Sequence, residues 1–308
     1  MSRVAVLGAG GNGSSAAADL IARGEHEVVV IDQWPAHVEA MRAQGLRIRM
    51  PDRELSVAVP ALHLCDVQAL QEPFDVVFLA VKAYDTRWAC ELIRPHLKRD
   101  GLLVGLQNGM TVETVVDVVG SSRTVGCVVE LSSELFTPGI VKRNTPPEKT
   151  WFAIGSADGA TEARLPEVAA ILDAVGTVTF SSDILSAKWT KLVVNAMGLG
   201  PDGLVGLDST ESSELSDMRD LCQRIGDEAI AVGERSGYVL QPLFGLRPED
   251  LGGPEDARDR LMGKLVGDHV VQVLGGAGNR DRARVPERVS HARSMPERAA
   301  ALRAGAFV

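Results

Sequence analysis

The sequence predicts an α/β protein with a doubly wound parallel sheet in its N-terminal half and a mostly helical domain after it. Two patterns lead to this fold class. Strands and helices alternate over roughly the first 180 residues, and a long helical pattern follows. With 308 residues, 45% of them hydrophobic, the chain is longer than one hydrophobic core usually serves, so two domains are expected.

A glycine-rich turn joins the first strand to the first helix. The apolar strand covers residues 4–7, and the helix over residues 14–23 stops at a glycine. Between them lie Gly8, Ala9, Gly10, Gly11, Asn12 and Gly13. In a dinucleotide-binding turn, Gly8 makes the bend, Gly10 lets backbone N–H groups approach a pyrophosphate, and Gly13 allows close helix–strand packing. A Rossmann dinucleotide-binding domain is therefore expected, with a merely tight strand–helix turn as the alternative.

The second strand ends in a carboxylate, Asp32, about twenty residues after the last glycine of the turn, as the dinucleotide-binding fingerprint requires. A carboxylate there accepts hydrogen bonds from ribose hydroxyls and repels a 2′-phosphate, so Asp32 favours NAD over NADP. No arginine adjoins Asp32, and the nearest basic candidate on another loop is Lys82. The alternative is that Asp32 only begins the turn over residues 32–35.

Further strands and helices alternate toward residue 183. Strands are expected over residues 75–81, 102–106, 124–130 and 178–180, and helices over 84–93, 113–119 and 162–174. Ligands of a doubly wound sheet lie beyond the carboxyl ends of its strands, which places Lys82 and the segment Gln107-Asn108-Gly109 at the cofactor crevice. Two short segments, 140–143 and 150–154, are predicted to be hairpin-like pieces at the antiparallel edge of this domain.

The predicted domain boundary lies near residue 183, dividing the chain into residues 1–183 and 184–308. The residues just before this boundary supply caps for a long helix. On that helix, Lys191 and Asn195 are four residues apart and share a face with Lys188, so that an ammonium and an amide could meet one substrate. The alternative is a solvated helix face. A core helix is expected over residues 212–237.

Composition excludes several classes of protein. A net charge of −9 offers no basic surface for nucleic acid. No apolar run has the length of a membrane span, and the N-terminus lacks the features of a secretory signal, so a cytoplasmic protein is expected. The four cysteines form no Cys-x-x-Cys pair and the histidines have no metal-binding spacing, so neither disulfides nor a metal site is expected.

Four blocks of sequence, in this order, resemble the ketopantoate reductase family. They are the glycine turn 8–13, Ala80-Val81-Lys82-Ala83, Leu106-Gln107-Asn108-Gly109-Met110 and the segment 188–195, Lys-Trp-Thr-Lys-Leu-Val-Val-Asn. The resemblance covers roughly residues 1–200. It implies a Rossmann domain, a helical domain of the 6-phosphogluconate dehydrogenase type, and hydride transfer between nicotinamide and the 2-oxo group of a small branched acid. Family members often pair through the helical domain, which makes a homodimer a possible assembly.

The resemblance also implies roles for individual residues. Lys191 would be the catalytic lysine that gives the proton to the carbonyl oxygen, where an ammonium stabilises the developing alkoxide. Asn108 would position substrate and nicotinamide, and Asn195 would hold the substrate. The residues expected to bind the cofactor are Gly8, Gly10, Gly11, Asn12, Gly13, Asp32, Lys82 and Asn108.

The chain departs from the family pattern at three places. The best-studied members of the family use NADPH and carry a basic residue where this chain has Asp32-Gln33, so the resemblance favours NADP and Asp32 favours NAD. Leu199 stands where a second asparagine often follows Asn195, which makes ketopantoate itself a doubtful substrate. The family's C-terminal pattern of Ser, Asp and Glu is not found.

The last segment, residues 274–308, is atypical. Seven Arg, no Lys and three acidic residues give it a net charge of +4, so that the first 273 residues carry −13. It is either a basic tail that folds onto the acidic body or, as we favour, a segment that departs from the family, for example through a change of reading frame.

These observations predict an NAD(P)-dependent oxidoreductase that acts on a small 2-oxo or 2-hydroxy acid with a lysine as general acid and base. Two alternatives stay open. One is a catalytically impaired NAD(H)-binding protein that acts as a sensor, and the other is a dehydrogenase of another hydroxy acid or of a sugar acid.

Overall fold

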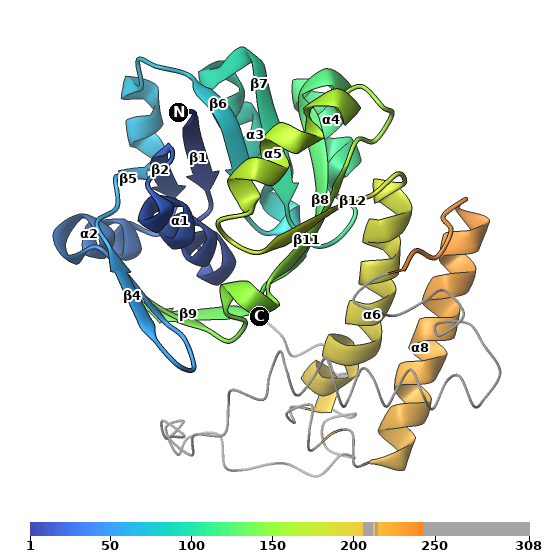
Figure 1. Ribbon diagram of the computed structural model, residues 1–308. Helices are drawn as coiled ribbons and strands as arrows, with labels where there is room; N and C mark the ends of the chain where they lie inside the picture. Colours follow the sequence, from blue (N-terminus) through green and yellow to red (C-terminus); the bar gives the residue numbers. More distant parts are fainter. Residues whose placement is uncertain (206–211, 213–214, 243–308) are drawn as a thin grey trace, which may run out of the picture. The chain divides into compact units, whose positions relative to one another are not determined.

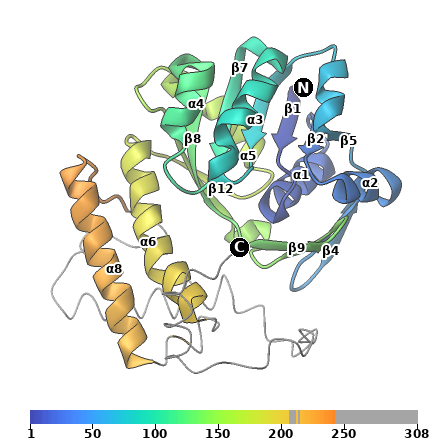
Figure 2. The ribbon, with the colours of Figure 1, turned by 180° about the vertical axis from the view of Figure 1, so that it is seen from behind.

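The structure is a computed structural model that describes residues 1–205, 212 and 215–242, all within one compact unit (Figures 1 and 2). The predictions for residues 243–308, including the arginine-rich segment 274–308, lie outside the described residues. Within the described chain, no helix is both long and apolar enough to span a membrane, and no three or more His, Cys, Asp or Glu side chains are grouped so as to hold a metal ion.

An eight-stranded sheet lies at the centre of the described residues, with the strand order β12-β11-β8-β7-β6-β1-β2-β5. Neighbouring strands are parallel except for β8 and β11, which are antiparallel. The strands are β1 (Arg3–Leu7), β2 (Glu27–Asp32), β5 (Ala61–His63), β6 (Phe74–Leu79), β7 (Leu97–Leu106), β8 (Thr124–Glu130), β11 (Trp151–Gly155) and β12 (Thr177–Phe180). The Rossmann-type α/β fold predicted from the sequence is confirmed.

Helices cover both faces of this sheet (Figures 1 and 2). Along β1, Val4 and Val6 pack with α1 and α5, whereas Ala5 and Leu7 pack on the opposite face with α3 and α4. Both sets are fully buried, which explains why the strand is a continuous apolar run. The helices are α1 (Gly11–Arg23), α2 (Pro35–Gln44), α3 (Thr86–Ile93), α4 (Val112–Val119), α5 (Leu165–Leu172), α6 (Ile184–Val205) and α8 (Ser216–Arg235).

Helices α6 and α8 pack side by side beyond the sheet (Figure 1). The predicted cap is present, since the Asp183 carboxylate accepts a hydrogen bond of 3.0 Å from the backbone N–H of Ser186. Val193 and Met197 of α6 lie in one apolar cluster with Ile230 of α8. Helix α6 begins at the predicted boundary, although the division into two domains at this point stays a prediction.

A second, four-stranded sheet corrects the predicted hairpin. This sheet has the order β4-β3-β10-β9, where the strands are β3 (Leu46–Arg49), β4 (Glu54–Val57), β9 (Ser133–Thr137) and β10 (Ile140–Arg143). Strand β10 therefore pairs with β9 and β3, and not with the segment 150–154, which is β11 of the main sheet. The turn lies at Pro138-Gly139, where Gly139 has φ +77°, and this turn signal was missed. The expected antiparallel edge is present only in part: β11 runs antiparallel to β8, but the edge strand of the main sheet is β12, which is parallel to β11.

Arg143 ties the second sheet to the first helix. Its side chain is fully buried and forms an ion pair with Asp19 of α1. The same guanidinium donates hydrogen bonds to the Thr145 carbonyl at 2.7 Å, to the Thr150 hydroxyl at 2.9 Å and to the Val175 carbonyl at 3.2 Å. One charged side chain thus connects three parts of the chain that lie apart in the sequence: helix α1, the segment 143–150 and Val175.

We expect Arg143→Met to lower the free energy of unfolding by about 3–5 kcal/mol, because it leaves the Asp19 carboxylate buried without its partner. Urea unfolding measures the effect. In the matched control, Arg87→Met removes an exposed ion pair with Asp117 and should cost less than about 1 kcal/mol. Equal losses in the two variants would contradict the anchoring role.

Candidate functional site

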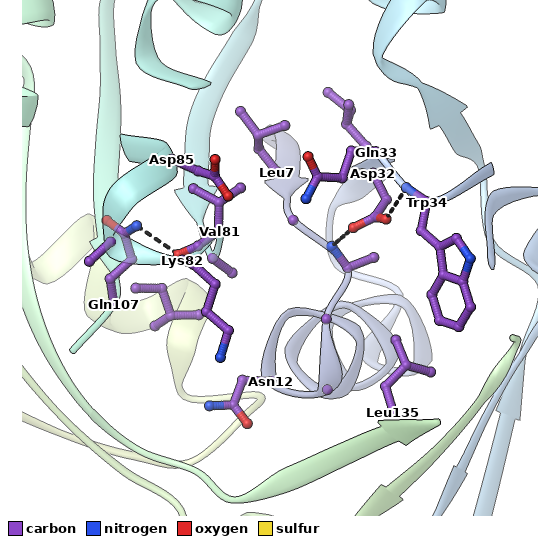
Figure 3. Close-up of a pocket in the computed structure, with 18 of the residues that line it drawn as sticks. Leu7, Asn12, Asp32, Gln33, Trp34, Val81, Lys82, Asp85, Gln107 and Leu135 are labelled. Carbon is purple, nitrogen blue, oxygen red and sulfur yellow. Dashed lines mark hydrogen bonds between the residues drawn. The ribbon is translucent and has the colours of Figure 1, made fainter. Parts of the chain in front are cut away.

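A pocket of about 710 Å³ lies at the carboxyl ends of β1, β2, β6 and β7 (Figure 3). Asp32 and Trp34 line it on one side and Lys82 on the other, with the first turn of α1 between them. The pocket brings together most of the residues predicted to bind a cofactor: Gly8, Gly10, Gly11, Asn12, Asp32, Lys82 and Asn108.

The glycines of the turn meet different constraints. Gly8 has φ +100°, and a Cβ there would lie 2.7 Å from the Val81 nitrogen. A Cβ on Gly13 would overlap the carbonyl oxygen of Gly8, so helix α1 can approach β1 only because Gly13 has no side chain. Gly10 differs, since a Cβ there would have no atom within 4 Å. The space above Gly10 is open, as the approach of a phosphate group to the backbone would require.

Gly11 faces the second sheet. A Cβ on Gly11 would lie 2.6 Å from the Ser133 carbonyl oxygen. The Ser133 hydroxyl is also 2.9 Å from that of Ser15 on α1. Ser133 and Leu135 of β9 line the pocket, so the second sheet forms part of its wall. Sequence reasoning missed this wall because β9 itself was not predicted.

Asp32 is held by two backbone N–H groups, which Figure 3 marks with dashed lines. Its carboxylate accepts hydrogen bonds from Ala9 at 2.6 Å and from Trp34 at 2.7 Å. Each carboxylate oxygen can accept a further hydrogen bond, so neither contact excludes a ribose hydroxyl. The bond to Trp34 also shows that Asp32 does begin the turn into α2. Both interpretations of Asp32, as a partner for ribose hydroxyls and as the start of a turn, therefore fit the geometry.

His37 lies behind the glycine turn and was not singled out as a site residue. It is fully buried, and its Nδ1 accepts a hydrogen bond of 2.9 Å from the backbone N–H of Gly139. Its Nε2 lies 3.3 Å from the Ser14 hydroxyl, which donates to the Ala9 carbonyl. Burial lowers the pKa of His37. Its two ring nitrogens connect the glycine turn to the second sheet. Nothing in a single histidine on a helix signals such a contact.

Gln107 connects the loops that follow β6 and β7. Its side-chain amide donates hydrogen bonds to the Val81 carbonyl at 2.7 Å and to the Thr86 hydroxyl at 3.1 Å. These bonds hold the segment carrying Lys82 beside the segment carrying Asn108. Lys82 is the basic side chain among the described residues that line the pocket, and Figure 3 shows it on the side of Asn12.

Both lysines of α6 are buried, so the alternative of a solvated face is wrong for them. Lys191 is 4% exposed and forms an ion pair with Glu130 at the end of β8. Lys188 is 1% exposed and donates hydrogen bonds to the carbonyl oxygens of Gln107 at 2.6 Å and Cys127 at 3.0 Å. Burial lowers the pKa of Lys188 to about 8.

The structure brings the predicted residues together only in part. Lys191 and Asn195 are not among the described residues that line the pocket, and Asn195 is half-buried one turn beyond Lys191. What connects α6 to the pocket is Lys188, through the carbonyl of the residue before Asn108. Glu130 was missed as a partner of Lys191, because nothing in the sequence relates the end of β8 to a helix some sixty residues later.

A family model described as ketopantoate reductase PanE/ApbA matches residues 4–157. The 2-dehydropantoate 2-reductase of Halobacterium salinarum is 30% identical over 244 residues, which are 77% of this chain and 77% of that protein. A PanE/ApbA family ketopantoate reductase from Ralstonia eutropha has a similar structure, with a TM-score of 0.68 and 25% identity over 88% of this chain and 91% of that one.

The fold is also similar to that of D-mandelate dehydrogenase, solved with NADH and anilino(oxo)acetate. The TM-score is 0.72, and 19% of residues are identical over 88% of this chain and 99% of that one. At this level of identity, the likeness concerns the fold alone.

We expect Gly10→Ala to weaken cofactor binding and Gly13→Ala to weaken the fold. Gly10→Ala should change the free energy of unfolding by less than about 0.5 kcal/mol, yet weaken NADH binding at least about tenfold, because its methyl group would occupy the open space above the turn. Gly13→Ala should destabilise the fold by about 1–3 kcal/mol or more, through overlap with the backbone of Gly8. Urea unfolding and titration of nicotinamide fluorescence measure the two effects. Unchanged NADH binding by Gly10→Ala would contradict this use of the turn.

Proposed function

We propose a reaction for this chain, which belongs to the ketopantoate reductase family of NAD(P)-dependent oxidoreductases. It transfers hydride between NAD(H) and a small 2-oxo or 2-hydroxy acid, and Lys191 is the general acid and base. The proposed binding of a dinucleotide rests on the open space above Gly10, between the carboxylate of Asp32 and the loop of Lys82. The residues present fit a dinucleotide, because the backbone can approach a pyrophosphate at the turn and a carboxylate stands ready for ribose hydroxyls.

We propose NAD as the preferred cofactor. Asp32 is 8% exposed, and its charge would oppose a 2′-phosphate placed at the end of β2. Lys82, the basic side chain that could offset this charge, follows β6 on the other side of the pocket. The family resemblance favours NADP, so the preference depends on this one carboxylate.

A nicotinamide cofactor, when bound, would supply the hydride, and the chain would supply the proton. As the hydride adds to the carbonyl carbon, negative charge develops on the carbonyl oxygen and is stabilised by the Lys191 ammonium. An Nζ–H bond of Lys191 then breaks and an O–H bond forms, leaving a neutral amine and the 2-hydroxy acid. Oxidation runs through the same residue in reverse. Asn108 and Asn195 are proposed to orient the substrate through their amide groups.

The substrate is proposed to be a 2-oxo acid other than ketopantoate, although ketopantoate belongs in every test. Leu199 is an apolar side chain where the family often has an asparagine, which removes a hydrogen-bond donor for the substrate. D-mandelate dehydrogenase is named for an aromatic 2-hydroxy acid, so phenylglyoxylate should be tested beside ketopantoate. Turnover of ketopantoate would instead place the protein in pantothenate biosynthesis. The cytoplasmic location and the homodimer stay predictions.

Lys191→Ala should lower turnover at least about a hundredfold, because it removes the proton donor, and leave NADH binding within a few-fold of the wild type, because the glycine turn and Asp32 are untouched. The variant also removes the buried ion pair with Glu130, so its folding is checked by urea unfolding. Turnover is followed by the absorbance of reduced nicotinamide with ketopantoate, phenylglyoxylate and other 2-oxo acids, and binding by nicotinamide fluorescence. Lys142→Ala, at an exposed ion pair with Glu134, is the matched control. If the wild type binds NADH without turnover of any acid in either direction, the sensor alternative replaces this proposal.

Asp32→Asn should shift cofactor preference. We expect the wild type to bind NADH at least about tenfold more tightly than NADPH, since a charge near a 2′-phosphate costs binding energy. The variant loses the charge and also one of the two oxygens that accept from Ala9 and Trp34. The lost acceptor should weaken both cofactors alike, so the test is the ratio of the two dissociation constants, which should move toward one. Equal binding of NADH and NADPH by the wild type would contradict the NAD assignment.

A further inference from the structure

The buried ammonium of Lys188 joins three elements and has no role in the proton transfer proposed above. Its two hydrogen bonds go to backbone carbonyl oxygens, of Gln107 at 2.6 Å and of Cys127 at 3.0 Å. Among the described residues, no carboxylate lies within ion-pair distance of Lys188. Burying an ammonium in this way is costly, and an apolar side chain of similar size would fill the space without that cost.

The two carbonyl groups lie where the pairing of β7 and β8 ends. The last register pair of this parallel ladder is Leu106 with Cys127. Beyond it, residues 107–110 form no strand. Lys188 therefore links the two strands at the point where their own ladder stops, and it does so from helix α6.

Gln107 connects helix α6, the loop after β6 and Asn108. Its carbonyl oxygen accepts from Lys188, its side chain donates to the Val81 carbonyl, and its peptide bond leads directly to Asn108. One turn farther along α6, Lys191 reaches Glu130 at the end of β8. The position of α6 along these strand ends thus decides where the Lys191 amine lies relative to Asn108.

We propose that Lys188 is a positioning residue for the reaction: by holding the carbonyl groups of Gln107 and Cys127, it sets helix α6, which carries Lys191, against the segment that carries Asn108. This inference rests on the proposed function, which assigns Lys191 and Asn108 to the chemistry. Loss of the ammonium removes the two hydrogen bonds by which α6 holds the carbonyl groups of Gln107 and Cys127.

The experiment compares Lys188→Met with Lys188→Gln in the full-length protein. The two new side chains have similar length and volume, but only glutamine keeps two N–H donors for the two carbonyl groups. Lys98→Met is the matched control, because Lys98 lies at the other end of β7 in a part-exposed ion pair with Asp75. For each variant, kcat and KM are measured with NADH and the 2-oxo acid that the wild type reduces fastest, and NADH affinity is measured by fluorescence titration.

We expect Lys188→Met to lower kcat by about tenfold to a hundredfold, since small displacements of reacting groups have effects of this size. NADH affinity should change less than about threefold, because the glycine turn and Asp32 are untouched. Lys188→Gln should retain more of kcat than Lys188→Met, and Lys98→Met should match the wild type. If Lys188→Met does not fold, Lys188→Ala, which leaves room for a water between the two carbonyl groups, takes its place.

Other outcomes overturn the inference. An unchanged kcat in Lys188→Met shows that no positioning is needed. Equal losses in Lys188→Met and Lys188→Gln show that the N–H donors are not what matters. A loss of NADH affinity as large as the loss of kcat indicates a general structural role. These results leave the proposed function intact if the wild type turns over and Lys191→Ala does not, whereas an inactive wild type contradicts the proposed function and the positioning role together.

Discussion

Close packing of helix α1 on strand β1 is the constraint on which the rest of the structure depends. The helix can start where it does only because Gly13 leaves room for the carbonyl oxygen of Gly8. This contact brings the backbone N–H of Ala9 to the carboxylate of Asp32, 2.6 Å away, and so joins the turn to the end of β2. A side chain at position 13 would separate the helix from the strand, and the pocket would lose both its floor and its carboxylate.

The site is assembled from loops that hold one another through backbone carbonyl groups. Gln107 links the ends of β6 and β7 through its side chain, and Lys188 links β7, β8 and α6 through its ammonium. His37 and Ser14 connect the glycine turn to the second sheet. Such contacts orient loops without contributing an apolar core, and they place the groups of a site on several rigid elements at once.

Local sequence patterns predicted individual helices and strands well. The helix after the glycine turn, the strands at the centre of the sheet and the capped start of α6 are confirmed, because each depends on residues close in sequence. The pairing of β10 was predicted wrongly. Its true partners, β9 and β3, were not recognised, and pairing is decided by which strands meet in space. The turn at Pro138-Gly139 was the one local signal that pointed to β9.

The candidate site was likewise predictable from the sequence only in part. The residues of the glycine turn, Asp32, Lys82 and Asn108 were identified from the sequence alone and line one pocket, because the carboxyl ends of parallel strands share an edge. The burial of Lys188 and Lys191 was not predictable, since an isolated lysine pair on a helix is typical of a solvated face. Their partners, the carbonyl of Gln107 just after β7 and the carboxylate of Glu130 at the end of β8, lie far away in the chain.

The sequence by itself determined the dinucleotide-binding type of fold and the carboxylate at the end of β2, because glycine spacing and strand periodicity are properties of short segments. Only the tertiary structure decided which lysine meets which partner, where the second sheet closes the pocket and how α6 is held against the main sheet. These depend on contacts between residues distant in the chain, which no local pattern encodes.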